Sequence, residues 1–280
     1  MIRVAAHAKV NLYLHVVGRR ADGYHLLDSL AVFVDLNDTL VVAPADDLAL
    51  AIGGPFADAL AGEGDNLVLS AARALANAHG REARARLTLI KRIPVSAGIG
   101  GGSADAAAAL RALSELWSVA IPDDLPLKLG ADVPVCLAGR PLFMSGIGET
   151  LHPAPPLPPA FLLLVNPGVA VATKDVFRAR SGAFSPAAAF GEAPRDAAHM
   201  AGILRGRGND LTAAAAVLAP AIREAERLVA ATEGCLLARM SGSGATVFGL
   251  YAGADEAAKA AASIRRERPA WWSWSGAIRG

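Results

Sequence analysis

Apolar and polar residues alternate along the first segment of the chain, residues 2–17. This period of two is typical of a β-strand whose two faces differ in chemistry. We therefore predict a strand that turns at Gly18 and again near Asp22-Gly23. One face carries Ala6, Ala8, Val10, Leu12, Leu14 and Val16, and the other carries His7, Lys9, Asn11, Tyr13 and His15.

Similar patterns predict a mixture of helices and strands over the rest of the chain. Apolar residues at helical spacing predict helices over residues 66–79, 106–117, 174–179, 216–230 and 257–266. Short apolar runs predict strands over residues 30–36, 39–42, 87–90, 161–165, 246–251 and 272–278. A tight turn and a short buried element are expected over residues 130–137.

These elements indicate an α+β protein with two lobes. A chain of 280 residues is long enough for two domains of ordinary size. The proline cluster over residues 153–159 is the best candidate for the boundary between them. We predict an N-terminal domain over residues 1–153 and a C-terminal domain over residues 154–280.

A glycine-rich run follows the predicted strand at residues 87–90. It holds four glycines within five positions, residues 98–102, and good helix formers follow at once. Glycine costs about 1 kcal/mol relative to alanine inside a helix, so this run predicts a loop. Successive N–H groups and the start of a helix can together bind a phosphate. A flexible connector between domains is the alternative.

Two common phosphate-binding motifs do not fit this run. The P-loop ends in Gly-Lys-Ser/Thr, and no lysine occurs between Lys91 and Lys128. The dinucleotide motif Gly-x-Gly-x-x-Gly needs a glycine at its sixth position, where this chain has Ser103. A nicotinamide-dependent oxidoreductase is therefore the last-ranked function.

Composition narrows the possible partners. The 27 basic and 26 acidic residues nearly balance, which does not indicate a nucleic-acid or membrane surface. Two distant cysteines, Cys136 and Cys235, fit a reducing cytoplasm. Polar residues interrupt the N-terminal apolar run, and prolines interrupt residues 150–173, so we expect a soluble, cytoplasmic protein. His7, His152 and His199 lack the spacing of a zinc site.

Four separated segments resemble one family, the GHMP small-molecule kinases. They are Ala8-Lys9-Val10-Asn11-Leu12 with residues 20–25, the glycine run, Gly130-Ala131-Asp132-Val133-Pro134, and Ser241-Gly242-Ser243-Gly244-Ala245. The similarity covers nearly the whole chain and is weakest over residues 178–208. It implies the two-lobed GHMP kinase fold, with the active site in the cleft between the lobes.

The resemblance also implies a catalytic pair, Lys9 and Asp132. Asp132 would act as general base on the acceptor hydroxyl. Lys9 would keep that carboxylate ionised, orient the hydroxyl and offset charge on the γ-phosphoryl group of ATP. Without the family resemblance, the sequence favours a solvent-exposed charge for Lys9 and a helix-capping role for Asp132. Mg²⁺ would bridge the ATP phosphates, and the implied ATP site is Pro94, Val95, Ser96, Ala97, Gly98, Ile99, Gly100, Gly101, Gly102, Ser103 and Ala104.

Within the family, the chain is most similar to members that phosphorylate a cytidine diphosphate derivative in isoprenoid precursor biosynthesis. Tyr24 and His25 would then recognise cytosine, with Phe177 as a second stacking ring. Taken alone, the first two close a hairpin and the third is a core residue. The implied substrate-binding residues are Asn11, Tyr24, His25, Phe177, Gly242, Ser243 and Gly244.

The chain departs from this kinase at two places. Ser96-Ala97 replaces what is often glycine, and Asp105 stands where a neutral asparagine is frequent. A carboxylate there favours the helix dipole but repels phosphate unless it meets a cation. Asp105 is expected either to face away from the phosphates or to meet Mg²⁺. The alternative functions are a mevalonate- or homoserine-type kinase of the same family and a non-catalytic nucleotide sensor. No feature of the sequence indicates an oligomeric state.

Overall fold

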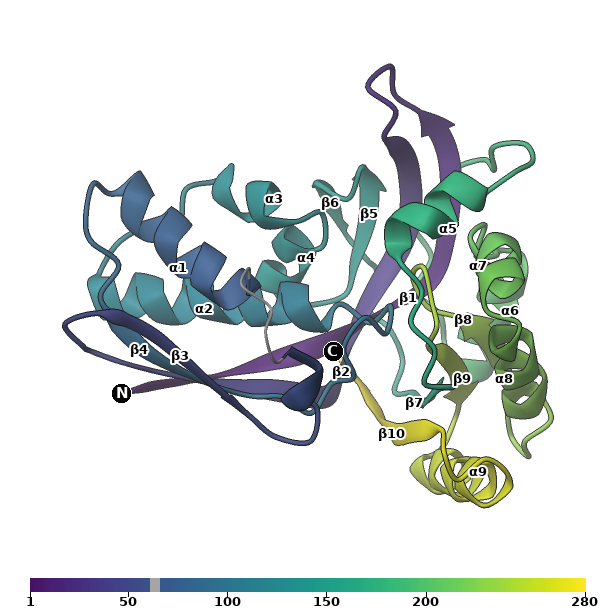
Figure 1. Ribbon diagram of the computed structural model, residues 1–280. Coiled ribbons are helices and arrows are strands. Elements are labelled where there is room, and N and C mark those ends of the chain that lie inside the picture. The colour runs from purple at the N-terminus through teal and green to yellow at the C-terminus, as the bar shows by residue number, and fades with distance from the viewer. Residues whose placement is uncertain (61–65) are drawn as a thin grey trace. The chain divides into compact units, whose positions relative to one another are not determined.

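The computed structural model describes residues 1–60 and 66–280 (Figure 1). The chain forms two compact units, each assembled from separate stretches. The first unit consists of Met1–Lys9, Leu36–Val95 and Gly100–Gly139, and the second of Val10–Asp35, Ser96–Ile99 and Arg140–Gly280. The predicted boundary at residues 153–154 stays a prediction, because units that share strands do not define one cut in the chain.

Two long strands, β1 (Ile2–Arg19) and β2 (His25–Ala43), run through both units. The predicted N-terminal strand is confirmed, but its polar face is also buried, with Lys9 and Asn11 each 3% exposed. Residues 30–36 and 39–42 were expected as separate strands and are parts of β2. The polar pair Asn37-Asp38 does not interrupt β2, because the Asp38 carboxylate accepts hydrogen bonds from Lys91 and from backbone amides.

In the first unit, helices pack together beside a small mixed sheet. Strand β4 pairs antiparallel with β2 and parallel with β3. Asn66 caps the first long helix by accepting a 2.9 Å hydrogen bond from the Val68 amide, and α1 packs along α2 (Figure 1). The elements are β3 (Leu48–Gly53), the 3₁₀ turn Asp58–Leu60, α1 (Leu67–Ala78), β4 (Ala85–Ile90), α2 (Gly101–Trp117), α3 (Leu125–Leu129) and α4 (Val133–Ala138).

In the second unit, an antiparallel sheet has the strand order β2-β10-β7-β9-β8. Helices α8 and α9 pack on it, and the apolar residues between them form the core. The strands are β5 (Leu142–Gly146), β6 (Thr150–Pro153), β7 (Phe161–Asn166), β8 (Leu237–Met240), β9 (Val247–Tyr251) and β10 (Trp272–Arg279). The helices are α5 (Thr173–Ala179), α6 (Ala197–Arg205), α7 (Thr212–Leu218), α8 (Ala221–Ala230) and α9 (Ala254–Glu267).

The α+β class is confirmed, and one predicted helix is wrong. Residues 216–230 form no single helix, because α7 ends at Leu218 and α8 begins at Ala221. Pro220 lies between them, and proline cannot donate the backbone hydrogen bond that a continuous helix needs there. Within the described residues, no helix combines the length and the apolar character needed to cross a membrane.

Candidate active site

The side chains of Lys9 and Asp132 meet in the first unit. Lys9 Nζ lies 2.8 Å from Asp132 Oδ2, although about 120 positions separate the two residues in the chain. The lysine side chain is 3% exposed, whereas the aspartate side chain is 36% exposed. The pair therefore has a buried cation and a carboxylate that solvent or a ligand can reach.

Asp132 does not cap a helix, which was its alternative role. It occupies the N-cap position of α4, but its side chain makes no capping hydrogen bond. Pro134 lies in the first turn of α4 and leaves one fewer backbone donor there. The Asp132 carboxylate is therefore available to pair with Lys9.

Within the glycine run, Gly100 lies against Lys9 of this pair. It has a φ of +68°, and a Cβ at this position would lie 3.2 Å from Lys9 Cε. Only glycine accepts this backbone conformation without strain and also leaves room for the lysine. The α2 helix begins directly afterwards at Gly101, so its free N–H groups start beside Lys9.

Asp105 was expected either to face away from the phosphates or to meet Mg²⁺, and in the structure its carboxylate meets a lysine. Asp105 is buried in α2, and its Oδ2 accepts a 2.7 Å hydrogen bond from Lys91 Nζ. The same ammonium donates to Asp38 Oδ2 at 2.5 Å. The cation that this carboxylate needs is therefore Lys91. No sequence pattern singles out Asp38, which lies in the middle of strand β2.

The front of the glycine run lies against the second glycine-rich segment. The buried Ser241 hydroxyl donates to Gly98 O at 3.1 Å and accepts from the Asn11 amide at 3.1 Å. A Cβ on Gly98 would lie 2.4 Å from Gly244 O, so the two backbones touch. Asn11 Nδ2 also donates to Ser29 Oγ at 2.7 Å. The structure thus brings together predicted residues from three of the four motif segments.

Two of the three predicted cytosine-binding residues are stacked on each other. The rings of His25 and Phe177 lie 5.1 Å apart at an angle of 24°. Burial, with smaller contributions from Arg19 and Arg180, lowers the pKa of His25. A neutral imidazole offers one donor and one acceptor nitrogen. Tyr24 is 62% exposed and has no place in this stack.

Neighbouring side chains that the motifs did not single out fix the Ser241–Gly244 turn. Asn209 Nδ2 donates to Met240 O at 2.8 Å and to Gly242 O at 2.9 Å. The hydroxyls of Thr173 and Ser243 are 2.8 Å apart, which ties the start of α5 to the same turn. A lone asparagine outside a motif carries no sequence signal for this role.

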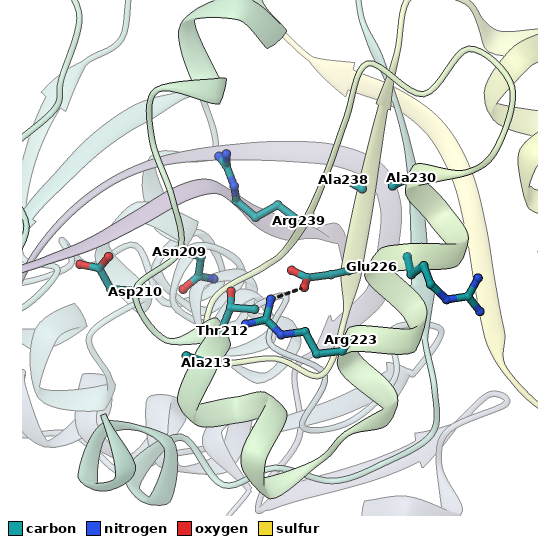
Figure 2. A pocket seen from close by; sticks show the side chains of 10 residues that line it. Asn209, Asp210, Thr212, Ala213, Arg223, Glu226, Ala230, Ala238 and Arg239 are labelled. Carbon is teal, nitrogen blue, oxygen red and sulfur yellow. Dashed lines mark hydrogen bonds and ion pairs between the residues drawn. The ribbon is translucent and has the colours of Figure 1, made fainter. Parts of the chain in front are cut away.

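A hollow of about 750 Å³ lies in the second unit, and Asn209 is one of its lining residues. Figure 2 shows the side chains that line it. Arg223 and Glu226, three residues apart on α8, form a 2.9 Å hydrogen bond at its wall. None of the predicted catalytic, ATP-binding or substrate-binding residues lines this hollow. We therefore do not assign this hollow to the candidate active site.

The structure also bears on metal binding and thiol chemistry. Among the described residues, no group of three or more His, Cys, Asp or Glu side chains could hold a metal ion. Cys136 and Cys235 are both free thiols. Burial raises the pKa of Cys136 to about 12, with a further contribution from Asp132. This thiol therefore stays protonated at neutral pH.

Sequence comparisons identify the chain's relatives. Residues 66–141 match the GHMP kinases N-terminal domain, and residues 189–270 match the GHMP kinases C-terminal domain. The 4-diphosphocytidyl-2-C-methyl-D-erythritol kinase of Rhodospirillum rubrum is 56% identical over 273 residues, covering 96% of this chain and 90% of that protein. The kinase of the same name from Paramagnetospirillum magneticum is 55% identical and covers 96% and 95%.

Solved structures agree with these relatives. A crystal structure of 4-(cytidine 5'-diphospho)-2C-methyl-D-erythritol kinase superimposes with a TM-score of 0.81 at 38% identity, over all of both chains. A mevalonate kinase structure has a TM-score of 0.67 at 12% identity over all of both chains, which shows a shared fold. With both family domains matched and near-complete coverage by relatives more than half identical, the chain belongs to the GHMP kinase family, in the branch of the 4-diphosphocytidyl-2-C-methyl-D-erythritol kinases.

Proposed function

We propose that this chain transfers the γ-phosphoryl group of ATP to the 2-hydroxyl of 4-diphosphocytidyl-2-C-methyl-D-erythritol. The products are the 2-phosphate and ADP, in the methylerythritol phosphate route to isoprenoid precursors. The relatives named for this substrate cover the chain almost completely. The observation that carries the proposal is the 2.8 Å contact between Lys9 Nζ and Asp132 Oδ2.

In this proposal, Asp132 accepts the proton of the 2-hydroxyl as its oxygen attacks the γ-phosphorus. Its half-exposed carboxylate is open to a substrate, whereas Lys9 is buried and held in one place. The lysine ammonium orients the carboxylate and hydroxyl and offsets charge that builds on the transferred group. A positioned general base contributes about 10²–10⁴-fold to such a reaction.

The glycine run, residues 94–104, is the proposed ATP site. Gly100 places the start of α2 beside Lys9, so N–H groups that bind phosphate lie next to the ammonium. Mg²⁺ usually keeps several waters and is held by one or two carboxylates together with the phosphates. In this proposal, Mg²⁺ would arrive with ATP and neutralise its phosphates.

The second unit supplies the proposed cytidine diphosphate site. His25 and Phe177 offer flat ring faces, and a neutral imidazole can hydrogen-bond a base edge. Gly242, Ser243 and Gly244 are the proposed contacts to the substrate's diphosphate, with Asn11 tied to the same turn through Ser241. A cytoplasmic location, expected from the two distant cysteines, stays a prediction.

Two other functions are less well supported. A mevalonate- or homoserine-type kinase would share the fold, but the similarity to those structures is only 12–16% identity. A non-catalytic nucleotide sensor has no use for a paired base and lysine, and this chain has both in contact.

A substrate panel tests the proposal. Phosphate transfer from ATP is measured with 4-diphosphocytidyl-2-C-methyl-D-erythritol, mevalonate and homoserine at equal concentrations. We expect turnover with the first substrate alone, and competitive inhibition by cytidine diphosphate. Turnover of mevalonate or homoserine at a comparable rate would assign the chain to another branch of the family. No turnover of any of the three would favour the sensor.

A further inference from the structure

A buried group of three charges lies beneath the start of α2. Asp38 is fully buried, and Lys91 and Asp105 are 2% and 3% exposed. Lys91 Nζ contacts Oδ2 of both carboxylates, at 2.5 Å for Asp38 and 2.7 Å for Asp105. A Cβ on Gly101, the first residue of α2, would lie 3.5 Å from the same Nζ. The three charges are thus adjacent to the end of the glycine run.

These side chains hold the glycine run at both of its ends. Asp38 Oδ1 accepts hydrogen bonds from the backbone amides of Arg92 and Ile93, directly before Pro94. Lys91 joins that anchor to Asp105, five residues into the helix that follows the run. The group therefore fixes where the run begins and where it ends.

The charges of the group do not balance. Two carboxylates share one ammonium, which leaves one negative charge in excess if both are ionised. Asp105 Oδ1 is buried and has no hydrogen-bond partner among the described residues. Excess negative charge in low dielectric is costly, and a neighbouring carboxylate makes it costlier. Burial and the charge of Asp38 together outweigh Lys91 and raise the pKa of Asp105 to about 8.

We propose that Asp105 is a positioning residue that binds a proton when ATP phosphates occupy the glycine run. The proposal rests on the proposed ATP site described above. With Asp105 neutral, Lys91 and Asp38 balance each other, and no buried negative charge opposes the phosphates. Above about pH 8, where the ligand-free chain has lost this proton, ATP binding takes it up from solvent and nucleotide release returns it to solvent. Asp105 touches neither substrate.

Other titratable groups near α2 do not account for such a proton. On α4, the Cys136 thiol is already protonated because burial raises its pKa to about 12. Lys9 of β1, against Gly100, is paired with Asp132. Arg73 on α1 and Lys128 on α3 are exposed. Arg111 of α2 donates hydrogen bonds to the carbonyls of Cys136 and Leu137. Lys91 and Asp38 are the groups in direct contact with Asp105.

Calorimetry of Mg²⁺–ATP binding to the full chain at pH 8.5 tests the proposal. Titrations in buffers of different ionisation enthalpy count the protons taken up, at a pH where Mg²⁺–ATP carries none. We expect roughly half a proton or more per ATP in the wild type and none in Asp105→Asn. We also expect the wild-type Kd to rise about tenfold between pH 7 and pH 9, and the Asp105→Asn value to stay flat.

Two further variants separate this proposal from its premise. Asp124→Asn removes a carboxylate that is exposed and paired with Lys128, and it should bind ATP and protons like the wild type. Gly102→Asp adds a carboxylate at an exposed position in the first turn of α2, where the fold tolerates it. If Gly102→Asp binds ATP normally, the assigned ATP site is wrong. If it loses ATP binding but wild type and Asp105→Asn take up equal numbers of protons, only the role of Asp105 is wrong.

Discussion

The position of Lys9 depends on a single glycine, Gly100. Gly100 has a positive φ, and its missing side chain leaves room for the lysine stem. The αL conformation costs a non-glycine residue roughly 1–2 kcal/mol. The contact with Lys9 adds a second effect, because the lysine must move away from Asp132 or the loop must shift.

Gly100→Ala should therefore reduce both stability and activity. We expect a loss of about 1–2 kcal/mol in the free energy of unfolding from backbone strain, and a fall in kcat of at least about tenfold from misplacement of the lysine. Gly80→Ala is the matched control, because Gly80 also has a positive φ, of +59°, but no atom lies within 4 Å of its Cβ position. Equal losses of kcat in the two variants would contradict this account of Gly100.

At the scale of elements, the hydrophobic pattern of the sequence correctly predicted helices and strands that have one apolar face. The strand at the N-terminus, the helix that Asn66 caps and the helix that follows the glycine run all lie where the sequence predicts them. Short elements were missed. Strands β3, β5, β6 and β8 are only four to six residues long, and none of them was predicted.

The candidate site was predictable where a motif marks it and not where tertiary contacts create it. Lys9 and Asp132 carry motifs, and the structure joins them. Asp38 lies in a strand and Asn209 in a connection, and each acts through partners far away in sequence. The expected alternatives for Asp105 omitted Lys91 because nothing in the sequence shows that the two residues meet.

Arg239 shows how one buried side chain can join several elements. It lies in β8 and is 8% exposed, and its guanidinium donates to the carbonyls of Leu12, Leu204 and Arg207. Burial lowers its pKa to about 10, so it stays charged at neutral pH. These bonds tie β8 to β1 and to the end of α6.

Arg239→Met should leave three carbonyls without their donor. We expect a loss of about 3 kcal/mol or more in the free energy of unfolding, measured by urea denaturation, because each buried carbonyl left without a donor costs about 1–3 kcal/mol. Arg205→Met, which changes an exposed arginine on α6 with one bond to Leu236 O, should cost less than about 1 kcal/mol. Similar losses in the two variants would show that the buried bonds of Arg239 contribute little.

For the molecule as a whole, ionisation of Asp105 contributes to the pH dependence of the free energy of unfolding. Its pKa is about 8 when folded and 3.8 in the reference state, so between these values the folded chain binds a proton that the unfolded chain has released. Stability therefore falls as pH rises from about 4 to about 8, and this contribution is constant above that range. Urea denaturation at several pH values should show this decline in wild type and a shallower one in Asp105→Asn. Identical slopes would mean that Asp105 is ionised in the folded chain.

The most direct test of the proposed reaction is the turnover of Asp132→Asn with ATP and 4-diphosphocytidyl-2-C-methyl-D-erythritol at saturation. The amide can still accept a hydrogen bond from Lys9, and the side chain is 36% exposed, so the melting temperature should change little. We predict that kcat falls by about 10²–10⁴-fold, with KM values near those of wild type. A variant that folds normally and keeps kcat within about threefold of wild type would contradict the assignment of Asp132 as the base.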